Sequence, residues 1–239
     1  MPDAVDARLA QLADQYDLPD GAAARLRGVL DHVAAEPTSI TTVRDPARGV
    51  ELHVADSLAG LKVEQLRGAT SIADLGAGGG FPGLVLAVAL PAARVTLVES
   101  VGKKCEFLRR TAADLELHNI TVVNARAEAW HDGIGTQGAV TARALAPLTI
   151  LAEYAAPLLV DGGALVAWKG RRDAAEEADG AHAAGVLGLE PLPPRTVAPV
   201  PGADERRLYV YLKVAPTPAR FPRREGIARK RPLQRSMTA

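Results

Sequence analysis

The chain of 239 residues has little cysteine, few aromatic side chains and no long apolar run. Its single cysteine, Cys105, excludes an internal disulfide and a zinc site built from several thiolates. No stretch reaches the roughly 20 apolar residues of a membrane span, and the N-terminus lacks the layout of a signal peptide. Aromatic residues form only 4% of the chain, which argues against an extended base-stacking surface. We therefore expect a cytoplasmic monomer with no metal and no membrane partner.

Charge is balanced overall but unevenly distributed. The chain has 28 basic and 28 acidic residues, yet residues 219–239 carry a net charge of +6 and the remainder carries −6. A basic tail on an acidic body is typical of proteins that contact a polyanion, although a solvated tail is an equally good interpretation. Because residues 222–239 contain few apolar anchors, we expect them to be disordered in the free protein.

Apolar spacing predicts helices over residues 4–16 and 20–34 and a third from Pro46 to about Leu61. Strands and helices alternate from Ser71 onward. The predicted strands are Ser71–Leu75, Arg94–Glu99, Ile120–Asn124, Gly138–Ala142, Ala164–Lys169, about Glu190–Val197 and Leu208–Val214. The predicted helices between them are Pro82–Leu90, Gly102–Leu117, Pro147–Leu159 and Ala174–Ala184.

This alternation predicts an α/β fold with a seven-stranded, mainly parallel sheet and helices on both faces. No helix is predicted between the last two predicted strands, where Pro193, Pro194, Pro199 and Pro201 occur, so these strands could form an antiparallel hairpin at one end of the sheet. The predicted organisation is an N-terminal helical extension over residues 1–62, a core domain over 63–215 and a basic tail over 216–239.

A glycine-rich segment, ADLGAGGGFPG at residues 73–83, follows the first predicted strand. Open parallel sheets bind ligands outside the carboxyl ends of their strands, and glycine lets a cofactor approach the backbone. Gly78, Gly80 and Gly83 match the dinucleotide pattern, whereas the same count from Gly76 reaches Phe81. The glycines alone therefore do not separate a dinucleotide from S-adenosylmethionine.

Two acidic residues near this segment refine the choice of cofactor. Asp74 ends the first strand, where it would repel a pyrophosphate but favour the sulfonium and ammonium groups of S-adenosylmethionine. Glu99 ends the second strand and is suited to the ribose hydroxyls of either cofactor. The pair favours a methyltransferase over a nicotinamide dehydrogenase. An ordinary glycine turn with a capping aspartate is the structural alternative.

Further motifs follow one another in a specific order. They are Val43-Arg44-Asp45-Pro46 with His53, Asp56 and Ser57, the glycine-rich segment, Glu99 to Lys104, Asn124 to Glu128, Ala142-Arg143-Ala144, Trp168-Lys169-Gly170, Glu205-Arg206 and Phe221 to Leu233. In the order and spacing of these motifs the chain closely resembles the small-subunit ribosomal RNA guanine-N7 methyltransferases, the glucose-inhibited division B family. It departs from them in having Glu99 where Asp is common, and Gly79 where some members have Pro.

The resemblance implies a class I, Rossmann-like methyltransferase that uses S-adenosylmethionine to methylate N7 of one guanine in 16S ribosomal RNA. The partner would be small-subunit RNA or the 30S particle. Together with the analysis of the loop, it gives the predicted cofactor contacts as Asp74, Gly76, Gly78, Phe81, Glu99, Ala127, Glu128 and Arg143.

Guanine N7 carries an in-plane lone pair, so methylation needs positioning rather than a base. Arg143, Lys169 and Arg206 are the predicted positioning residues, since a cation suits the guanine O6; the alternative is that each is a surface cation. His53 and Asp56, one helical turn apart, could hydrogen-bond each other or orient the cofactor loop, and we favour a structural role for His53. Predicted RNA-binding residues, which can also be read as solvated cations, are Lys103, Lys104, Arg223, Arg224, Lys230 and Arg231.

Three other functions stay open at this point. The chain could be a methyltransferase of another RNA or of a small molecule, or a nicotinamide dehydrogenase. In a different class, it could be an RNA-binding scaffold with a vestigial cofactor pocket. The intact Asp74, Gly76, Gly78, Glu99 and Arg143 argue against that last possibility.

Overall fold

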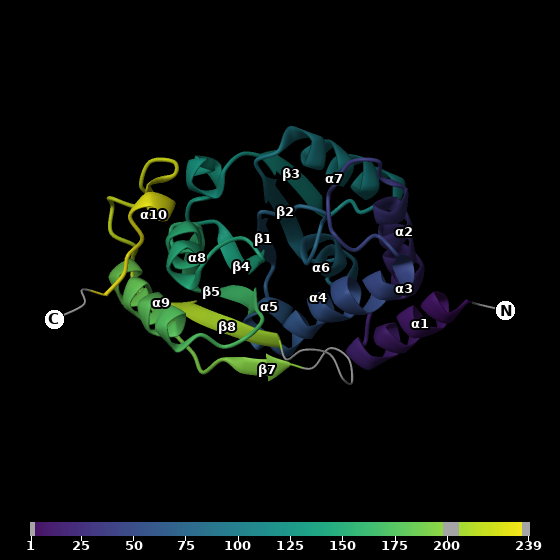
Figure 1. Ribbon diagram of the computed structural model, residues 1–239, viewed down its shortest axis with the longest axis horizontal. Helices are drawn as coiled ribbons and strands as arrows, with labels where there is room; N and C mark the ends of the chain where they lie inside the picture. The colour runs from purple at the N-terminus through teal and green to yellow at the C-terminus, as the bar shows by residue number, and fades with distance from the viewer. Residues whose placement is uncertain (1–2, 198–205, 236–239) are drawn as a thin grey trace.

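A mixed sheet in the order β3-β2-β1-β4-β5-β8-β6, with β7 also paired to β8, lies at the centre of the computed structural model (Figure 1). The structure describes residues 3–197 and 206–235. The strands are β1 Ser71–Leu75, β2 Arg94–Glu99, β3 Ile120–Asn124, β4 Gln137–Arg143, β5 Leu159–Lys169, β6 Leu189–Pro191, β7 Arg195–Val197 and β8 Arg206–Lys213. The pairs among β1 to β5 are parallel, and β8 is antiparallel to β5, β6 and β7.

The predicted α/β fold is confirmed, and the first three strands have the predicted bounds. The single strand predicted over Glu190–Val197 is wrong, because it divides into β6 and β7. Pro193 and Pro194 lie between the two and have no N–H with which to continue a ladder. The predicted antiparallel hairpin does form, but β8 is the strand that joins it to β5.

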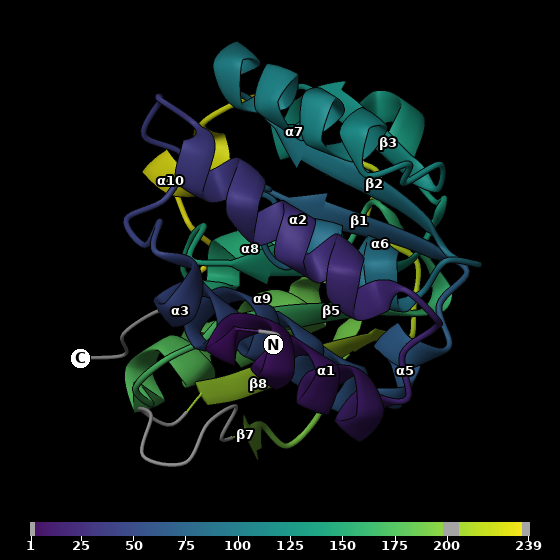
Figure 2. The same ribbon diagram turned by 90° about the vertical axis from the view of Figure 1, so that its right-hand side faces the viewer.

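Helices cover both faces of the sheet. One face carries α1 Ala4–Tyr16, α2 Ala22–Ala35, α5 Glu64–Arg67, α6 Gly83–Ala89 and α7 Gly102–Asp114, with α1 and α2 outermost (Figure 2). The other face carries α8 Leu148–Ala155 and α9 Ala174–Leu187. Each face of the sheet has its own hydrophobic core. Successive residues of β1 point to opposite faces, so Ile72 packs in the first core and Ala73 in the second. None of the described helices is long and apolar enough to cross a membrane.

The third predicted helix is present but irregular. Asp45 caps it and Pro46 opens it, and it then runs through α3 Pro46–Gly49, a π-helical segment Val50–Ala55, α4 Asp56–Leu58 and a 3₁₀ turn Ala59–Lys62. Wide π turns inside helices often occur at functional sites. Here the π segment carries His53 and leads directly into Asp56, which places both side chains at the carboxyl ends of the strands.

The expectation of a disordered tail is wrong for the described residues 222–235. This segment runs beside α8 and forms the short helix α10 Ile227–Lys230 (Figure 1). Phe221 and Ala228 are buried against the core beneath α8, and Arg223 forms an ion pair with Glu153 of that helix. Few apolar residues anchor this segment, but ion pairing with the acidic body also holds it against α8.

Gly163 of β5 provides a test of the strand packing. A Cβ there would lie 2.9–3.1 Å from the backbone oxygens of Gly138, Val160 and Gln137, which cannot move aside cheaply. We expect Gly163→Ala to lower the free energy of unfolding by about 1–3 kcal/mol in urea titrations. The matched control is Gly185→Ala in α9, where no atom lies within 4 Å and alanine should stabilise the helix by up to about 1 kcal/mol. Equal stability of the two variants would contradict this packing.

Candidate active site

The loop after β1 requires glycine at several positions. Gly76, Gly78 and Gly80 have φ values of 67°, 54° and 91°, in the left-handed region that side chains disfavour. A Cβ on Gly76 would also lie 2.6 Å from the side chain of Leu145, which follows β4. The glycine-rich segment therefore forms the tight turn at the strand ends that its sequence predicts.

Asp74 anchors this loop from the buried side, inside the protein. It is fully buried, its Oδ2 accepts a hydrogen bond from Gly83 N at 2.9 Å, and its Oδ1 accepts one from the Thr141 hydroxyl at 2.9 Å. Burial raises the pKa of Asp74 to about 7. Both oxygens are thus engaged within the protein, one by the start of α6 and the other by β4. The predicted contact of Asp74 with the cofactor stays a prediction.

Glu99 joins the loop after β1 to the loop after β2. Its Oε2 accepts a hydrogen bond from Gly78 N at 2.9 Å, and its Oε1 accepts one from Val101 N at 2.8 Å. A carboxylate oxygen can accept more than one hydrogen bond, so these contacts leave capacity for the hydroxyls of a ribose. The predicted contact of Glu99 with the cofactor stays a prediction.

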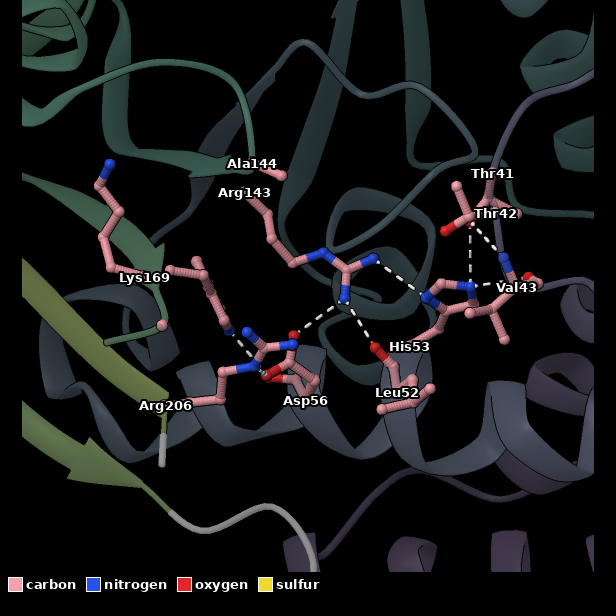
Figure 3. Close-up of a pocket in the computed structure, with 12 residues that line it drawn as sticks. Thr41, Thr42, Val43, Leu52, His53, Asp56, Arg143, Ala144, Lys169 and Arg206 are labelled. Atoms are coloured by element: carbon pink, nitrogen blue, oxygen red, sulfur yellow. Dashed lines mark hydrogen bonds and ion pairs between the residues drawn. The ribbon is translucent and has the colours of Figure 1, made fainter. Parts of the chain in front are cut away.

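A cavity of about 400 Å³ opens between the N-terminal helices and the carboxyl ends of β4 and β5; we call it the cationic cavity. Figure 3 shows basic side chains entering it from separate elements: Arg143 ends β4, Lys169 ends β5 and Arg206 begins β8. The volume lies in the usual range for small-molecule pockets. The structure thus brings all three predicted positioning residues to one cavity.

Asp56 is the centre of charge in this cavity, and its side chain is only 2% exposed. Arg143 Nη1 donates to its Oδ2 at 2.9 Å, and Arg206 Nε lies 3.3 Å from its Oδ1 (Figure 3). The second contact is an ion pair without hydrogen-bond alignment, so Oδ1 is a buried acceptor that lacks a hydrogen bond from the described residues. Two cations share one carboxylate here, which leaves the cluster with a net positive charge.

His53 orients Arg143 from the other side. Its Nδ1 lies 3.2 Å from Arg143 Nη2, and its Nε2 lies 3.0 Å from the Val43 carbonyl oxygen. A guanidinium can only donate, so Nδ1 must accept and Nε2 must carry the proton. Burial and the charge of Arg143 both lower the pKa of His53, which keeps the ring neutral. A structural role for His53 is confirmed, but its partners are Arg143 and Phe81, on which it stacks at 4.3 Å, rather than Asp56.

A second, smaller pocket lies over the ends of β1, β2 and β3; we call it the strand-end pocket. It brings together three of the predicted cofactor residues, Gly76, Ala127 and Glu128. Sequence reasoning missed the other residues that shape it: Ser100, Leu145, Tyr154 and Arg229. Arg229 belongs to the tail, which we expected to be disordered, so the sequence did not indicate that it lines this pocket.

At the junction of β1 and β4, neighbouring residues of the chain line the two cavities. Leu145 lines the strand-end pocket and its neighbour Ala144 lines the cationic cavity. In the sheet, β1 is followed in the chain by β2 on one side and has β4 on the other, so the strand order reverses at this junction. Open α/β sheets bind their ligands at such reversals.

The remaining predicted residues are more scattered. Lys169 Nζ lies 2.5 Å from Glu176 Oε1 and donates to the Ala146 carbonyl oxygen at 3.1 Å, so it is already neutralised at the cavity edge. Lys103 and Lys104, at the start of α7, are outside the lining of both cavities as the structure describes them. Of the tail cations, Arg224, Lys230 and Arg231 are exposed, whereas Arg223 is engaged by Glu153.

The raised pKa of Asp74 predicts a pH-dependent stability. Between about pH 4, where an unfolded aspartate titrates, and about pH 7 the folded protein keeps a proton that the unfolded chain loses. This group therefore makes stability fall as pH rises through that window and has no further effect above it. Asp74→Asn should remove this fall in urea titrations, while Asp20→Asn, at an exposed carboxylate, should follow the wild type. Parallel pH profiles for wild type and Asp74→Asn would refute the assignment.

Comparison with solved structures confirms the methyltransferase fold. A structure described as a predicted O-methyltransferase from Agrobacterium tumefaciens superposes with a TM-score of 0.51 and 26% identity, covering 67% of this chain and 81% of that one. A precorrin-6y C5,15-methyltransferase from Geobacter metallireducens gives a TM-score of 0.53 at 16% identity, covering 75% and 93%. The class I methyltransferase fold expected from the sequence is therefore confirmed.

Sequence comparison identifies the family. Residues 32–197 match the family model GidB, described as rRNA small subunit methyltransferase G. Ribosomal RNA small subunit methyltransferase G of Rubrobacter xylanophilus is 43% identical over 202 residues, 82% of this chain and 77% of the relative. Its counterpart in Deinococcus radiodurans is 41% identical over 215 residues, 88% and 84% of the two chains. The resemblance seen in the motifs is thus confirmed, and the chain belongs to the rRNA small subunit methyltransferase G family.

Proposed function

We propose that this protein transfers a methyl group from S-adenosylmethionine to N7 of a guanine in 16S ribosomal RNA. The observation that carries the proposal is that neighbouring residues at the β1/β4 junction, Ala144 and Leu145, line two separate cavities. The lining of the strand-end pocket suits a nucleoside, and the cations of the cationic cavity suit a base. Membership of the family supports RNA of the small ribosomal subunit as the substrate.

The lining of the strand-end pocket suits the adenosine part of the cofactor, and its volume of about 70 Å³ accommodates a portion of it. Its walls include small or apolar side chains from the strand ends, Val98, Ala127 and Leu145, which suit a flat purine ring. Glu128 supplies a buried acceptor, and Glu99, the last residue of β2, is the group that we assign to the ribose hydroxyls. When bound, the cofactor supplies an electrophilic methyl group on a sulfonium, and the chain's role is to hold it at Gly76 facing the cationic cavity.

The cationic cavity fits the target base. Arg143 and Arg206 provide donors for the guanine O6, and Trp168 adds an aromatic wall. His53 and Asp56 are both bound by Arg143, so they hold that arginine in position and are not free to remove a proton. This arrangement agrees with N7 chemistry, because the nitrogen already has its lone pair and the reaction depends on alignment.

RNA outside the target base would be held through its phosphates. Lys103 on α7 and the tail residues Arg224, Lys230 and Arg231 are exposed cations available for such contacts. Arg223 is not among these available cations, because its guanidinium forms an ion pair with Glu153. A splayed or looped-out nucleotide is the form of RNA that could deliver one base into a cavity.

The test of the proposal is methyl transfer from labelled S-adenosylmethionine to 30S particles and to naked 16S RNA, both from cells that lack this activity. We expect label in one guanine, with the product mapped to N7 by mass spectrometry. Label confined to large-subunit RNA, or absent from every ribosomal substrate, would overturn the assignment. Label at another atom of the same guanine would retain the substrate and refute the proposed chemistry.

Replacing the positioning cations should separate catalysis from cofactor binding. We expect Arg206→Ala to lower the rate of methyl transfer by roughly tenfold to a hundredfold, in the range of about 1–3 kcal/mol for one base contact. Lys169→Ala should lower the rate less, because Glu176 and the Ala146 carbonyl oxygen already hold its ammonium group. Cofactor affinity, measured by calorimetry, should stay near that of the wild type because both residues line the other cavity. The control is Arg195→Ala, an exposed cation on the adjacent strand β7. Unchanged turnover in both variants would remove these residues from the site.

A further inference from the structure

We propose that the docked tail, residues 221–235, forms one wall of the cofactor pocket, and that Arg229 is a cofactor-binding residue on the adenosine side. The inference rests on the proposed function, since it assigns the strand-end pocket to S-adenosylmethionine. It gives the basic tail a task different from the RNA contact that its charge predicts. Four observations along the tail support it.

The start of the tail is fixed to the body at two points. Phe221 is buried in the core beneath α8 and α9. Arg223 forms a two-pronged ion pair with Glu153 of α8, whose side chain is only 3% exposed. A buried carboxylate requires a charged partner, so Glu153 positions the tail as much as the tail neutralises Glu153. The tail thus has a built attachment directly beside the strand-end pocket.

The next contact reaches a residue that lines the pocket. Gly226, at a φ of 76°, turns the chain into α10, and its N–H donates to Glu128 Oε1 at 2.9 Å. Glu128 is buried and lines the strand-end pocket after β3. The tail backbone therefore fixes the orientation of the acidic group that faces the ligand.

Arg229 follows three residues later and lines the pocket itself. Its Nη2 donates to the Leu145 carbonyl oxygen at 3.1 Å, which holds the guanidinium near Gly76 and the end of β4. A guanidinium is planar, stacks on aromatic faces and donates in a fixed fork, all of which suit a purine ring. Arg229 and the neighbouring Lys230 are both exposed, but of these two only Arg229 lines the pocket as the structure describes it.

Tail docking should be coupled to the ligand. Within residues 221–235 only Phe221 and Ala228 are buried, so few apolar contacts offset the entropy lost when the segment becomes ordered. A ligand beneath Arg229 adds contacts that exist only in the docked state. Linkage then requires that the tail raise the affinity for the cofactor by the same factor by which the cofactor favours the docked tail.

The experiment is calorimetric titration with S-adenosylhomocysteine, the non-reacting product of the cofactor. We expect Arg229→Ala to weaken binding about tenfold, the effect of losing one charge-assisted contact. A chain ending at Arg220 should lose at least as much. Lys230→Ala removes the same charge from the next residue and should bind as tightly as the wild type. Thermal unfolding without ligand monitors the fold, and Arg229→Ala remains decisive if the shortened chain unfolds.

Limited trypsin digestion gives a second readout that needs no activity. S-adenosylhomocysteine should slow cleavage after Arg229 and Lys230 in the wild type, and should protect less in Arg229→Ala. Wild-type affinity in both Arg229→Ala and the shortened chain, with weaker RNA binding, would show that the tail serves RNA alone and would overturn the inference. Failure of the wild type itself to bind S-adenosylhomocysteine would instead refute the proposed function.

Discussion

The buried carboxylate of Asp56 ties the N-terminal helices to the catalytic edge of the sheet. It lies in a helical layer that precedes the first strand, yet its ion-pair partners are Arg143 at the end of β4 and Arg206 at the start of β8. Loss of this charge would leave two cations facing each other at the cavity and would release Arg143 from its place beside His53. Three distant segments that line the cationic cavity are therefore joined through one carboxylate.

Buried carboxylates also position the glycine-rich loop and the tail around the strand-end pocket. Asp74 and Glu99 anchor the glycine-rich loop through the backbone N–H groups of Gly83 and Gly78, and Glu128 receives the tail through Gly226. In each case a buried acid satisfies backbone donors that would otherwise be unpaired, which is the condition for a rigid irregular loop. The acidic body and the basic tail are thus parts of one arrangement.

The strands could be predicted closely because apolar runs between turn signals reflect local constraints that the chain carries with it. Ser71–Leu75, Arg94–Glu99 and Ile120–Asn124 have the bounds expected from the sequence. Arg143, Lys169 and Arg206 could be placed near one another because the strand ends of a parallel sheet share an edge. The hydrogen-bond partners of Asp74 could not be predicted in the same way, because one of them, Thr141, lies in a strand 67 residues later.

Glycine spacing and motif order are properties of the chain alone, so the class of fold, the family and the expected cofactor loop could be predicted from the sequence. The folded arrangement was needed to show which acids are paired inside the protein, which cation is already neutralised, and where the tail lies. Those outcomes depend on pairs such as Lys169 with Glu176 and Arg223 with Glu153. Such pairs form when folding brings distant segments together and removes their charges from water, a cost that no local pattern in the sequence records.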